Sequence, residues 1–382
     1  MTTQTIPKIL TRDFVLAFFA QFALTSVFHI LLPTLPIYLS KLGSEEIEIG
    51  VLIGSLSISS LVLRPFVGTA LLRIHEKYFM IIGALIFAFT SVAYIFAPPF
   101  WPFLIVRALQ GIGFAFFTTA SFTLIANISS GAHLAQSISY FILSFNISGT
   151  LAPPLGMFLI NNFSFTFLFL VCVGLSLCTL FITYKIGRRQ AVPLQKSSIE
   201  GSFFLSRKAV QPSIVGFSSF FIWTALSTFF PLYAVSQGVT NPGLFFSAVS
   251  IMLILSRVFG GKIFDFYSRE RIIMLCIIPY IIAMVILAFS KTLPMFILVV
   301  VIYGIGPAFL IPALMAYALD RGGSSGPVMG TFQAITDLGS TLGPVIMGIV
   351  IRSTGYPIMF LCLALTGIVT LYYFYFFVRK KG

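Results

Sequence analysis

The chain has 382 residues, of which 58% are hydrophobic and only 9% are charged, and its formal net charge is +13. Soluble domains carry about 25% charged residues, and no soluble fold has enough interior to bury so many apolar side chains. The composition therefore excludes a soluble protein and indicates a polytopic protein solvated by the lipid bilayer. The four cysteines all lie in apolar runs, where we expect them to fill the core rather than form disulfides or bind a metal.

Twelve apolar runs are long enough to cross the hydrocarbon layer, which takes about 20 helical residues. Pro/Gly-rich or charged breaks separate them, and the first run is too long for the apolar part of a signal peptide. We therefore predict an all-α membrane protein with twelve transmembrane helices. The predicted spans are residues 13–39, 48–72, 78–97, 101–126, 134–160, 164–185, 212–237, 243–265, 271–290, 293–318, 326–351 and 355–378.

A polar, basic segment divides these spans into six and six. We interpret it, residues 186–211, as a solvated cytoplasmic linker, and prefer this to a phospholipid-binding role. The predicted domains are an N-terminal six-helix bundle, residues 1–185, and a C-terminal six-helix bundle, residues 212–382.

Lys and Arg residues predict the orientation, because cytoplasmic loops of membrane proteins are enriched in them. With both termini placed inside, 17 of the 23 Lys and Arg residues fall in the inner segments and three in the outer loops. The remaining three, Arg64, Arg107 and Arg257, lie within predicted spans. This asymmetry predicts cytoplasmic termini, and it accounts for the basic charge without nucleic-acid binding.

The second half of the sequence repeats the first at a nearly constant offset. "RPFVG" at 64–68 matches "RVFGG" at 257–261, and "FLIVRALQGIGFAF" at 103–116 matches "FILVVVIYGIGPAF" at 296–309. Shared apolar composition does not explain a constant offset. Each repeat holds an even number of spans, so the halves insert with the same orientation, as parallel repeats. Two such bundles can rock about a shared central site, which predicts transport by alternating access.

This repeat and its motifs resemble the major facilitator superfamily over nearly the whole chain. "GGKIFDFYSRERI" at 260–272 is similar to the signature loop of that family, and "GTALLRIHEK" at 68–77 is a degenerate copy. Leu72 stands where the family has an aspartate. The residues at motif positions are Gly68, Arg73 and Lys77 in the first copy and Gly261, Asp265, Arg269 and Arg271 in the second.

Two further stretches are similar to motifs of the same superfamily. "RALQGIG" at 107–113 resembles the span-4 motif, whose membrane arginine is associated with proton coupling. "GTLAPPLG" at 149–156 resembles the span-5 motif of drug:proton antiporters, although Ala152 replaces a glycine. The resemblance implies the major facilitator fold, with two parallel six-helix bundles and a substrate site between them. The span-5 motif residues are Gly149, Pro153, Pro154 and Gly156.

Charged residues inside a membrane are rare and indicate function by default. Asp337 lies well inside a span, about 16 Å from its cytoplasmic end, and Arg64 lies about 12 Å from the same side. In the fold that the sequence resembles, span 2 faces span 11 and span 5 faces span 8. We therefore predict two interdomain pairs, Arg64 with Asp337 and Arg257 with Asn146. They are either latches that separate when the transporter opens inward or permanent structural contacts.

A polar stripe in the first span predicts the wall of an aqueous cavity, since Gln21, Thr25 and His29 share one helical face. His29 is either a group that titrates near neutral pH or a hydrogen-bonded packing residue. Arg107 and Gln110, one turn apart in the fourth span, are expected at the same cavity. The facing wall is predicted to carry Trp223, Thr224, Ser227, Thr228 and Tyr303.

The sequence contains no Gly-rich Lys-Ser/Thr loop for ATP, no cluster at metal-ligand spacing and no nucleophile-elbow motif. We therefore expect no enzyme activity, metal or cofactor. We predict a monomeric secondary active transporter in the inner (plasma) membrane of a bacterium or archaeon.

The predicted function is proton-coupled efflux of a small amphipathic or anionic organic molecule. The first half has no carboxylate well inside a span to attract a cationic substrate, and Arg107 favours an anionic or neutral one. One alternative is a proton symporter that imports an organic anion or sugar. A different class is a membrane receptor or scaffold that transports nothing.

Overall fold

The computed structural model describes residues 11–71, 73–129, 134–187, 207–266, 268–322 and 325–378. Side chains at several helix ends, among them those of residues 256–266, lie outside the described set.

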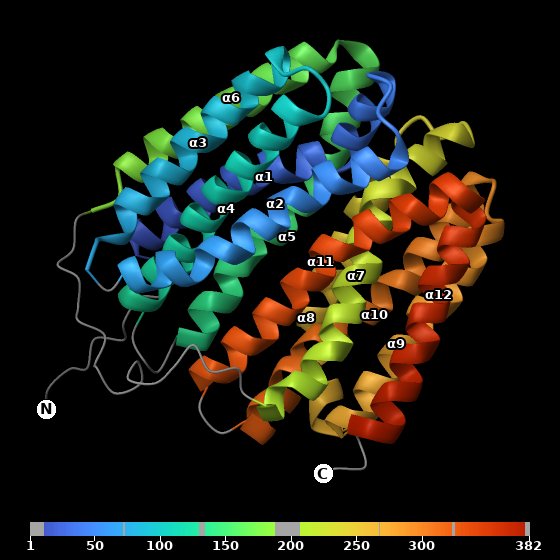
Figure 1. Cartoon of the computed structure of the whole chain (residues 1–382). Coiled ribbons are helices and arrows are strands. Elements are labelled where there is room, and N and C mark those ends of the chain that lie inside the picture. Colours follow the sequence, from blue (N-terminus) through green and yellow to red (C-terminus); the bar gives the residue numbers. More distant parts are fainter. Residues whose placement is uncertain are drawn as a thin grey trace, which may run out of the picture.

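The described residues form twelve α-helices and a final π-helical turn, with no strand among them (Figure 1). The helices are α1 (Arg12–Lys41), α2 (Glu46–Ala70), α3 (Glu76–Phe96), α4 (Trp101–Ile128), α5 (Leu134–Asn162), α6 (Phe165–Tyr184), α7 (Arg207–Ser236), α8 (Gly243–Phe266), α9 (Arg269–Phe289), α10 (Leu293–Gly322), α11 (Ser325–Thr354) and α12 (Tyr356–Tyr373), followed by η2 (Phe374–Val378). Eleven of them are long and apolar enough to cross a membrane, and α8 has a shorter described apolar part, Gly243–Leu255. The predicted all-α membrane class is confirmed.

Two glycines end equivalent helices of the repeat. Gly43 follows α1 with a φ of +86°, and Gly238 follows the last turn of α7 with a φ of +83°. Residues with a Cβ rarely adopt this left-handed conformation, so glycine is favoured at both turns. The two glycines are the last residues of "PIYLSKLG" and "PLYAVSQG", which lie 195 residues apart. The sequence repeat therefore recurs in the local backbone.

The repeat also recurs in the packing of the helices. In the first half α1 packs on α5 and α6, and α3 packs on α4 and α6. In the second half the equivalent helices make the same pairs, α7 with α11 and α12, and α9 with α10 and α12. Figure 1 shows α1 to α6, in blue to green, lying beside α7 to α12, in yellow-green to red. The two groups meet mainly through α2 on α11, α5 on α8 and α1 on α7.

The segment between the halves is described only in part. α6 ends at Tyr184 and α7 begins at Arg207, so the first turn of α7 lies inside the range predicted as linker, 186–211. Residues 188–206 lie outside the described residues.

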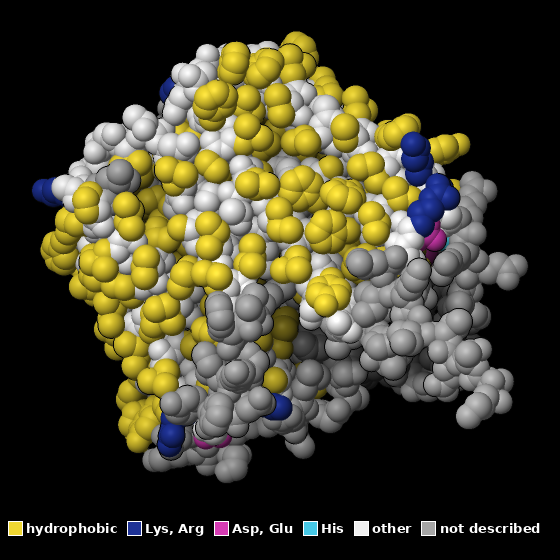
Figure 2. All heavy atoms as spheres, turned by 180° about the vertical axis from the view of Figure 1, so that it is seen from behind, with side chains coloured by type: hydrophobic (Ala, Val, Ile, Leu, Met, Phe, Trp, Pro, Cys, Tyr) yellow, Lys and Arg dark blue, Asp and Glu magenta, His cyan; other side chains and the backbone are white. Residues whose placement is uncertain are grey.

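The outer surface is apolar, as expected of a chain that lipid solvates. Figure 2 shows hydrophobic side chains over most of the visible face, with Lys and Arg near its margins. Large side chains such as Phe89, Phe96 and Phe181 are more than half exposed. Exposed apolar side chains cost nothing in hydrocarbon, because the bilayer core is as apolar as they are.

Candidate functional site

The two ends of the helix bundle differ in how closely the halves approach. We call the end at which α1 begins, α6 ends and α7 begins the linker end, and the opposite end the far end. At the far end α2 and α11 are in backbone contact. A Cβ on Gly50 would overlap the carbonyl group of Pro344, and a Cβ on Gly348 would lie 2.6 Å from the carbonyl oxygen of Glu46. Only glycine allows so close an approach of two helices.

The pair α5 and α8 repeats this arrangement on the other side of the far end. A Cβ on Gly243 would lie 2.5 Å from the carbonyl oxygen of Pro153. The Ser247 hydroxyl donates a hydrogen bond of 2.5 Å to the carbonyl oxygen of Thr150. The halves are thus closed against each other at the far end along both interfaces.

Two cavities lie between the halves, on the linker side of these contacts. The small cavity has a volume of about 70 Å³, and the large cavity has a volume of about 450 Å³. They share two lining residues, Leu32 of α1 and Trp223 of α7. The large cavity falls within the roughly 300–1,000 Å³ that is typical of small-molecule sites.

The large cavity is mostly apolar and aromatic, with His29, Asn146, Ser219 and Ser250 among its polar lining residues. Its lining residues are His29, Leu32, Ile142, Phe145, Asn146, Gly149, Ser219, Phe220, Trp223, Phe246, Val249, Ser250, Leu253, Tyr280, Pro307, Ala308, Ile311, Pro312 and Met315.

The small cavity contains most of the polar residues that the sequence placed in the central wall. Its lining residues are Phe28, Leu31, Leu32, Ile53, Leu56, Ser57, Arg107, Gln110, Trp223, Thr224, Ser227, Thr228 and Ser340. The predicted set Arg107, Gln110, Trp223, Thr224, Ser227 and Thr228 therefore meets at one place, contributed by α4 and α7.

Arg107 is a buried cation held by neutral acceptors. Its Nε donates to the carbonyl oxygen of Leu52 at 3.2 Å, and one terminal nitrogen donates to that of Ile53 at 3.3 Å. The other terminal nitrogen donates to Oε1 of Gln110 at 2.7 Å. The Tyr94 hydroxyl donates to the same oxygen at 2.6 Å. Among the described contacts of Arg107 there is no carboxylate, so its charge is dispersed over helix carbonyls and an amide.

His29 ends a chain of hydrogen bonds and presents its other nitrogen to the large cavity. Its Nδ1 lies 2.7 Å from Oγ of Ser148, whose hydroxyl has acceptors at Oγ1 of Thr25 and at the carbonyl oxygen of Phe145, both at 2.9 Å. If Ser148 donates its hydrogen to one of these, Nδ1 of neutral His29 donates to Ser148, and Nε2 carries the lone pair. Nε2 lies beside Gly149, which also lines the large cavity.

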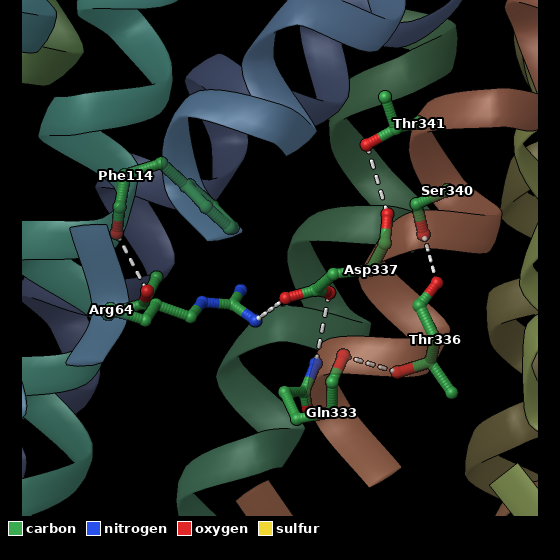
Figure 3. A network of polar contacts seen from close by, with 8 residues as sticks. Arg64, Phe114, Gln333, Thr336, Asp337, Ser340 and Thr341 are labelled. Carbon is green, nitrogen blue, oxygen red and sulfur yellow. Dashed lines mark hydrogen bonds and ion pairs between the residues drawn. The ribbon is translucent and has the colours of Figure 1, made fainter. Parts of the chain in front are cut away.

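The predicted pair of Arg64 and Asp337 is present in the structure (Figure 3). A terminal nitrogen of Arg64 lies 2.5 Å from Oδ2 of Asp337, and Nε2 of Gln333 donates to Oδ1 at 3.1 Å. The pair joins α2 to α11, as the expected facing of spans 2 and 11 requires. The Arg64 side chain is 27% exposed and that of Asp337 is 12% exposed, so the pair lies at the edge of the buried region.

The second predicted pair is described on one side only. Asn146 is buried on α5 and lines the large cavity, and its Nδ2 has no hydrogen-bond partner among the described residues. The side chain of Arg257 lies outside the described residues. The pair of Arg257 with Asn146 therefore stays a prediction.

Three residues predicted at the cavity wall lie behind it. Gln21 accepts a hydrogen bond of 2.9 Å from Ser121, and Thr25 receives the hydroxyl of Ser148, so both serve contacts between helices. Tyr303 is fully buried and stacks on Trp223, with ring centroids 6.0 Å apart. Neither of the two cavities is lined by these three. A single helical face includes both cavity-lining and helix-packing positions, and sequence spacing does not separate them.

Two serines that were not predicted line the cavities at equivalent positions of the sequence repeat. Ser57 lines the small cavity and Ser250 lines the large one, and they are 193 residues apart, the offset of the repeat. Leu56 and Val249 are related in the same way. The two cavities are therefore built from equivalent positions of α2 and α8.

The family model described as Major Facilitator Superfamily matches residues 17–323 and 213–382. The chain belongs to the major facilitator superfamily. It is accordingly a membrane transporter and not an enzyme, and the resemblance in its motifs is confirmed.

Relatives within the superfamily include one protein named for export and one named for quinolone resistance. The staphylopine export protein of Staphylococcus aureus is 24% identical over 378 residues, which cover 93% of this chain and 91% of that protein. The quinolone resistance protein NorA of the same organism is 22% identical, with 84% of each chain covered.

Solved transporter structures show the same fold. A point mutant of the nucleoside transporter NupG superimposes with a TM-score of 0.83 at 16% identity, covering 95% of this chain and 99% of that one. The human organic anion transporter MFSD10 gives a TM-score of 0.68 at 16% identity, with coverage of 95% and 99%. The predicted major facilitator fold is confirmed.

The superfamily's signature loop lies at the linker end in this chain. Lys77 donates from Nζ to the carbonyl oxygens of Tyr184 and Ile186, at 2.5 Å and 2.6 Å. In the second copy, Arg269 donates to the carbonyl oxygen of Ala316 at 3.1 Å. Both basic residues thus tie the loop to a neighbouring helix. Gly68, Arg73 and Arg271 are exposed, and Gly261 lies in α8. Leu72 and the side chain of Asp265 lie outside the described residues.

The span-5 motif of the superfamily lies on α5 against both α1 and α8. A Cβ on Gly156 would lie 2.9 Å from the carbonyl oxygen of Ile30, and one on Gly149 would lie 2.5 Å from Oγ of Ser250. Pro153 packs on Gly243 at the far end, and the carbonyl oxygen of Pro154 accepts a hydrogen bond of 3.4 Å from Asn241. The glycines of this motif serve close packing, and α5 remains helical through both prolines.

Proposed function

We propose that this transporter exports a small amphipathic or anionic organic molecule by proton-coupled alternating access. The observation that carries the proposal is the position of the two cavities between halves that are closed at the far end. Motion of one half against the other would close these cavities on the linker side and open them at the far end. An export direction is supported by the relatives named as an export protein and a quinolone resistance protein.

The electrostatics of the cavities support an anionic or neutral substrate. Arg107 lines the small cavity, and among the described residues that line either cavity there is no Asp or Glu. A cationic substrate would meet a buried positive charge without a compensating carboxylate. A structural neighbour at 16% identity is named as an organic anion transporter, which agrees with this choice.

Two groups are candidates for the coupled proton. His29 lines the large cavity with its Nε2 beside Gly149, and an imidazole nitrogen can take up a proton. Asp337 is a membrane carboxylate paired with Arg64, and its protonation would remove the charge that holds this pair together. We assign the proton to His29 because it lines the large cavity, whereas Asp337 lines neither cavity.

The orientation and the domains complete the proposal. The linker end is the cytoplasmic end, because most Lys and Arg residues of the loops lie there. Residues 1–185 and 212–382 are the two moving bundles, residues 186–211 connect them, and one chain is the transporting unit in a bacterial or archaeal plasma membrane.

Transport into inside-out and right-side-out vesicles, with and without an imposed pH gradient, tests the proposal. We expect uptake into inside-out vesicles that are acidic inside, and collapse of this uptake when the gradient is dissipated. Uptake into right-side-out vesicles driven by an inward proton gradient would favour the alternative, import of an organic anion or sugar. The relatives named as an export protein and a quinolone resistance protein do not favour this alternative. Absence of any flux would favour a receptor or scaffold.

A further inference from the structure

The two cavities differ in chemistry although α2 and α8 line them from equivalent positions of the repeat. The small cavity contains Arg107 and Gln110, whereas the repeat places Val300 and Tyr303 at the equivalent positions of the second half. Neither Val300 nor Tyr303 lines the large cavity. The polar pair therefore belongs to one cavity, and the other is mostly apolar.

Two residues that line the small cavity, Arg107 and Gln110, have hydrogen-bond donors that the described residues do not use. Gln110 is fully buried, and its Nε2 has no hydrogen-bond partner among the described residues. Its Oε1 already accepts hydrogen bonds from Arg107 and Tyr94. These two donors fix the orientation of the amide, so Nε2 is the atom left without a partner among the described residues. Arg107 has five N–H groups, of which three are used by Leu52, Ile53 and Gln110.

These donors match a carboxylate better than other anions. A guanidinium presents parallel N–H groups to two coplanar oxygens, and the carboxylate carries the single negative charge that Arg107 can compensate. A doubly charged phosphate would need a second cation, and Arg107 is the one cation among the described residues that line the small cavity. One buried water needs roughly 10–15 Å³, so about 70 Å³ holds a carboxylate but not a ring system.

The two cavities are neighbours that share part of their lining. Trp223 and Leu32 line both, so a molecule whose carboxylate lies against Arg107 would pass these two side chains and extend into the large cavity. Phe145, Phe220 and Phe246 line that cavity, and its volume suits an aromatic or aliphatic body.

Resting on the proposed transport function, we infer that the substrate is an amphipathic monocarboxylate that binds across both cavities. Its carboxylate accepts hydrogen bonds from Arg107 and Gln110 in the small cavity, and its apolar body packs in the large cavity. Trp223 lies at the junction and contacts both parts.

The two tryptophans of the chain make this inference measurable. Trp101 is 70% exposed at the start of α4 and lines neither cavity, whereas Trp223 lies at their junction. The Trp101→Phe variant therefore leaves Trp223 as the one indole reporter. The probes are 4-iodobenzoate, whose iodine quenches indole fluorescence, and its neutral analogue 4-iodobenzamide, titrated into the full purified chain in lipid nanodiscs at pH 7.

We expect saturable quenching by the acid, with an affinity at least about tenfold higher than that of the amide, since hydrogen bonds to charged groups are the stronger ones. In the Trp101→Phe background, Arg107→Gln should remove this preference. Gln110→Glu keeps the acceptor for Arg107 and Tyr94 but supplies its own carboxylate and removes the free donor. It should weaken the acid at least about tenfold and leave the amide within about twofold.

Equal affinities of acid and amide, or equal losses of both in the folded Gln110→Glu protein, would overturn the inference. Vesicle flux separates it from the proposed function. Flux of a non-acidic solute together with equal binding of the two probes would refute the monocarboxylate site and keep the transporter. Acid-selective binding without flux of any probe would support the site and refute export.

Discussion

Arg64 and Asp337 form an ion pair of 2.5 Å between α2 and α11 in a structure whose far end is closed. The backbones of the two helices touch at Gly50 and Pro344, and the ion pair lies further towards the linker end. At this depth the long side chain of Arg64 spans the interface between α2 and α11. At the far end the backbones of the same two helices close this interface. The pair and the glycine contact thus hold one interface at two depths.

Neutralising Asp337 tests whether this pair stabilises the fold. Asp337→Asn keeps the size of the side chain but leaves the Arg64 guanidinium with a neutral partner. We expect a lower thermal unfolding temperature, because a hydrogen bond to a charged group contributes about 1.5–3 kcal/mol, and because partial exposure places this pair near the lower value. The double variant Arg64→Gln/Asp337→Asn should recover part of the loss, since no unpaired charge remains. Equal unfolding temperatures for all three proteins would contradict a stabilising pair.

The latch hypothesis makes a separate prediction about conformation. If the pair resists separation of the halves, Arg64→Ala and Asp337→Ala should both change the transport rate. They should also change the labelling of cysteines placed in the cavities by thiol reagents added from either side. Unchanged transport rates and unchanged labelling in both variants would refute the latch and show that the Arg64–Asp337 pair is a purely structural contact.

A methyl group at Gly50 should open the far end. In Gly50→Ala the new Cβ meets the carbonyl group of Pro344 on the helix backbone, which cannot give way as a flexible side chain can. We expect a shift towards a state open at the far end, measured as faster labelling of Ser57→Cys by an impermeant reagent from outside right-side-out vesicles. Gly174→Ala is the matched control, because a Cβ at Gly174 meets nothing within 4 Å. Equal labelling rates in the two variants would refute closure by this contact.

Much of the architecture could be predicted from the sequence because lipid imposes strong rules. Every backbone polar group must be paired inside the bilayer, so apolar runs of about 20 residues become helices, and their number and order follow. A constant repeat offset then relates the halves. The helical turn at residues 207–211 was less predictable, since a polar helical turn outside the bilayer leaves no hydropathy signal.

The site could be predicted only in part. Arg64 and Asp337 were identified because isolated charges in apolar spans are conspicuous, and their contact follows from depth and from the facing of spans. Tyr303 was misplaced because an aromatic residue with a polar tip fits a cavity wall as well as a second layer behind Trp223. The division into a small and a large cavity depends on side-chain packing, which spacing along the chain does not encode.

Lys77 should stabilise the end of α6. Its ammonium donates to two carbonyl oxygens, those of Tyr184 and Ile186, that have no helical partner beyond the last turn. Lys77→Met keeps the aliphatic stem but removes the donors and the charge at a helix C-terminus. We expect a loss of about 1 kcal/mol and faster hydrogen exchange in the last turn of α6, with Lys77→Arg intermediate. Exchange rates equal to those of the parent protein would show that these carbonyl groups do not depend on Lys77.

His29 should carry the proton without being needed for substrate exchange. Gln at this position can still donate to Ser148 but cannot take up a proton, so His29→Gln should abolish accumulation driven by a pH gradient and retain counterflow of labelled against unlabelled substrate. His75→Gln is the control, since His75 lies outside the cavities, next to Glu76. Gradient-driven accumulation that survives in His29→Gln and disappears in Asp337→Asn would move the proton to Asp337. Loss of both accumulation and counterflow in His29→Gln would instead identify His29 as a packing residue that holds Phe145 and Ser148 in place.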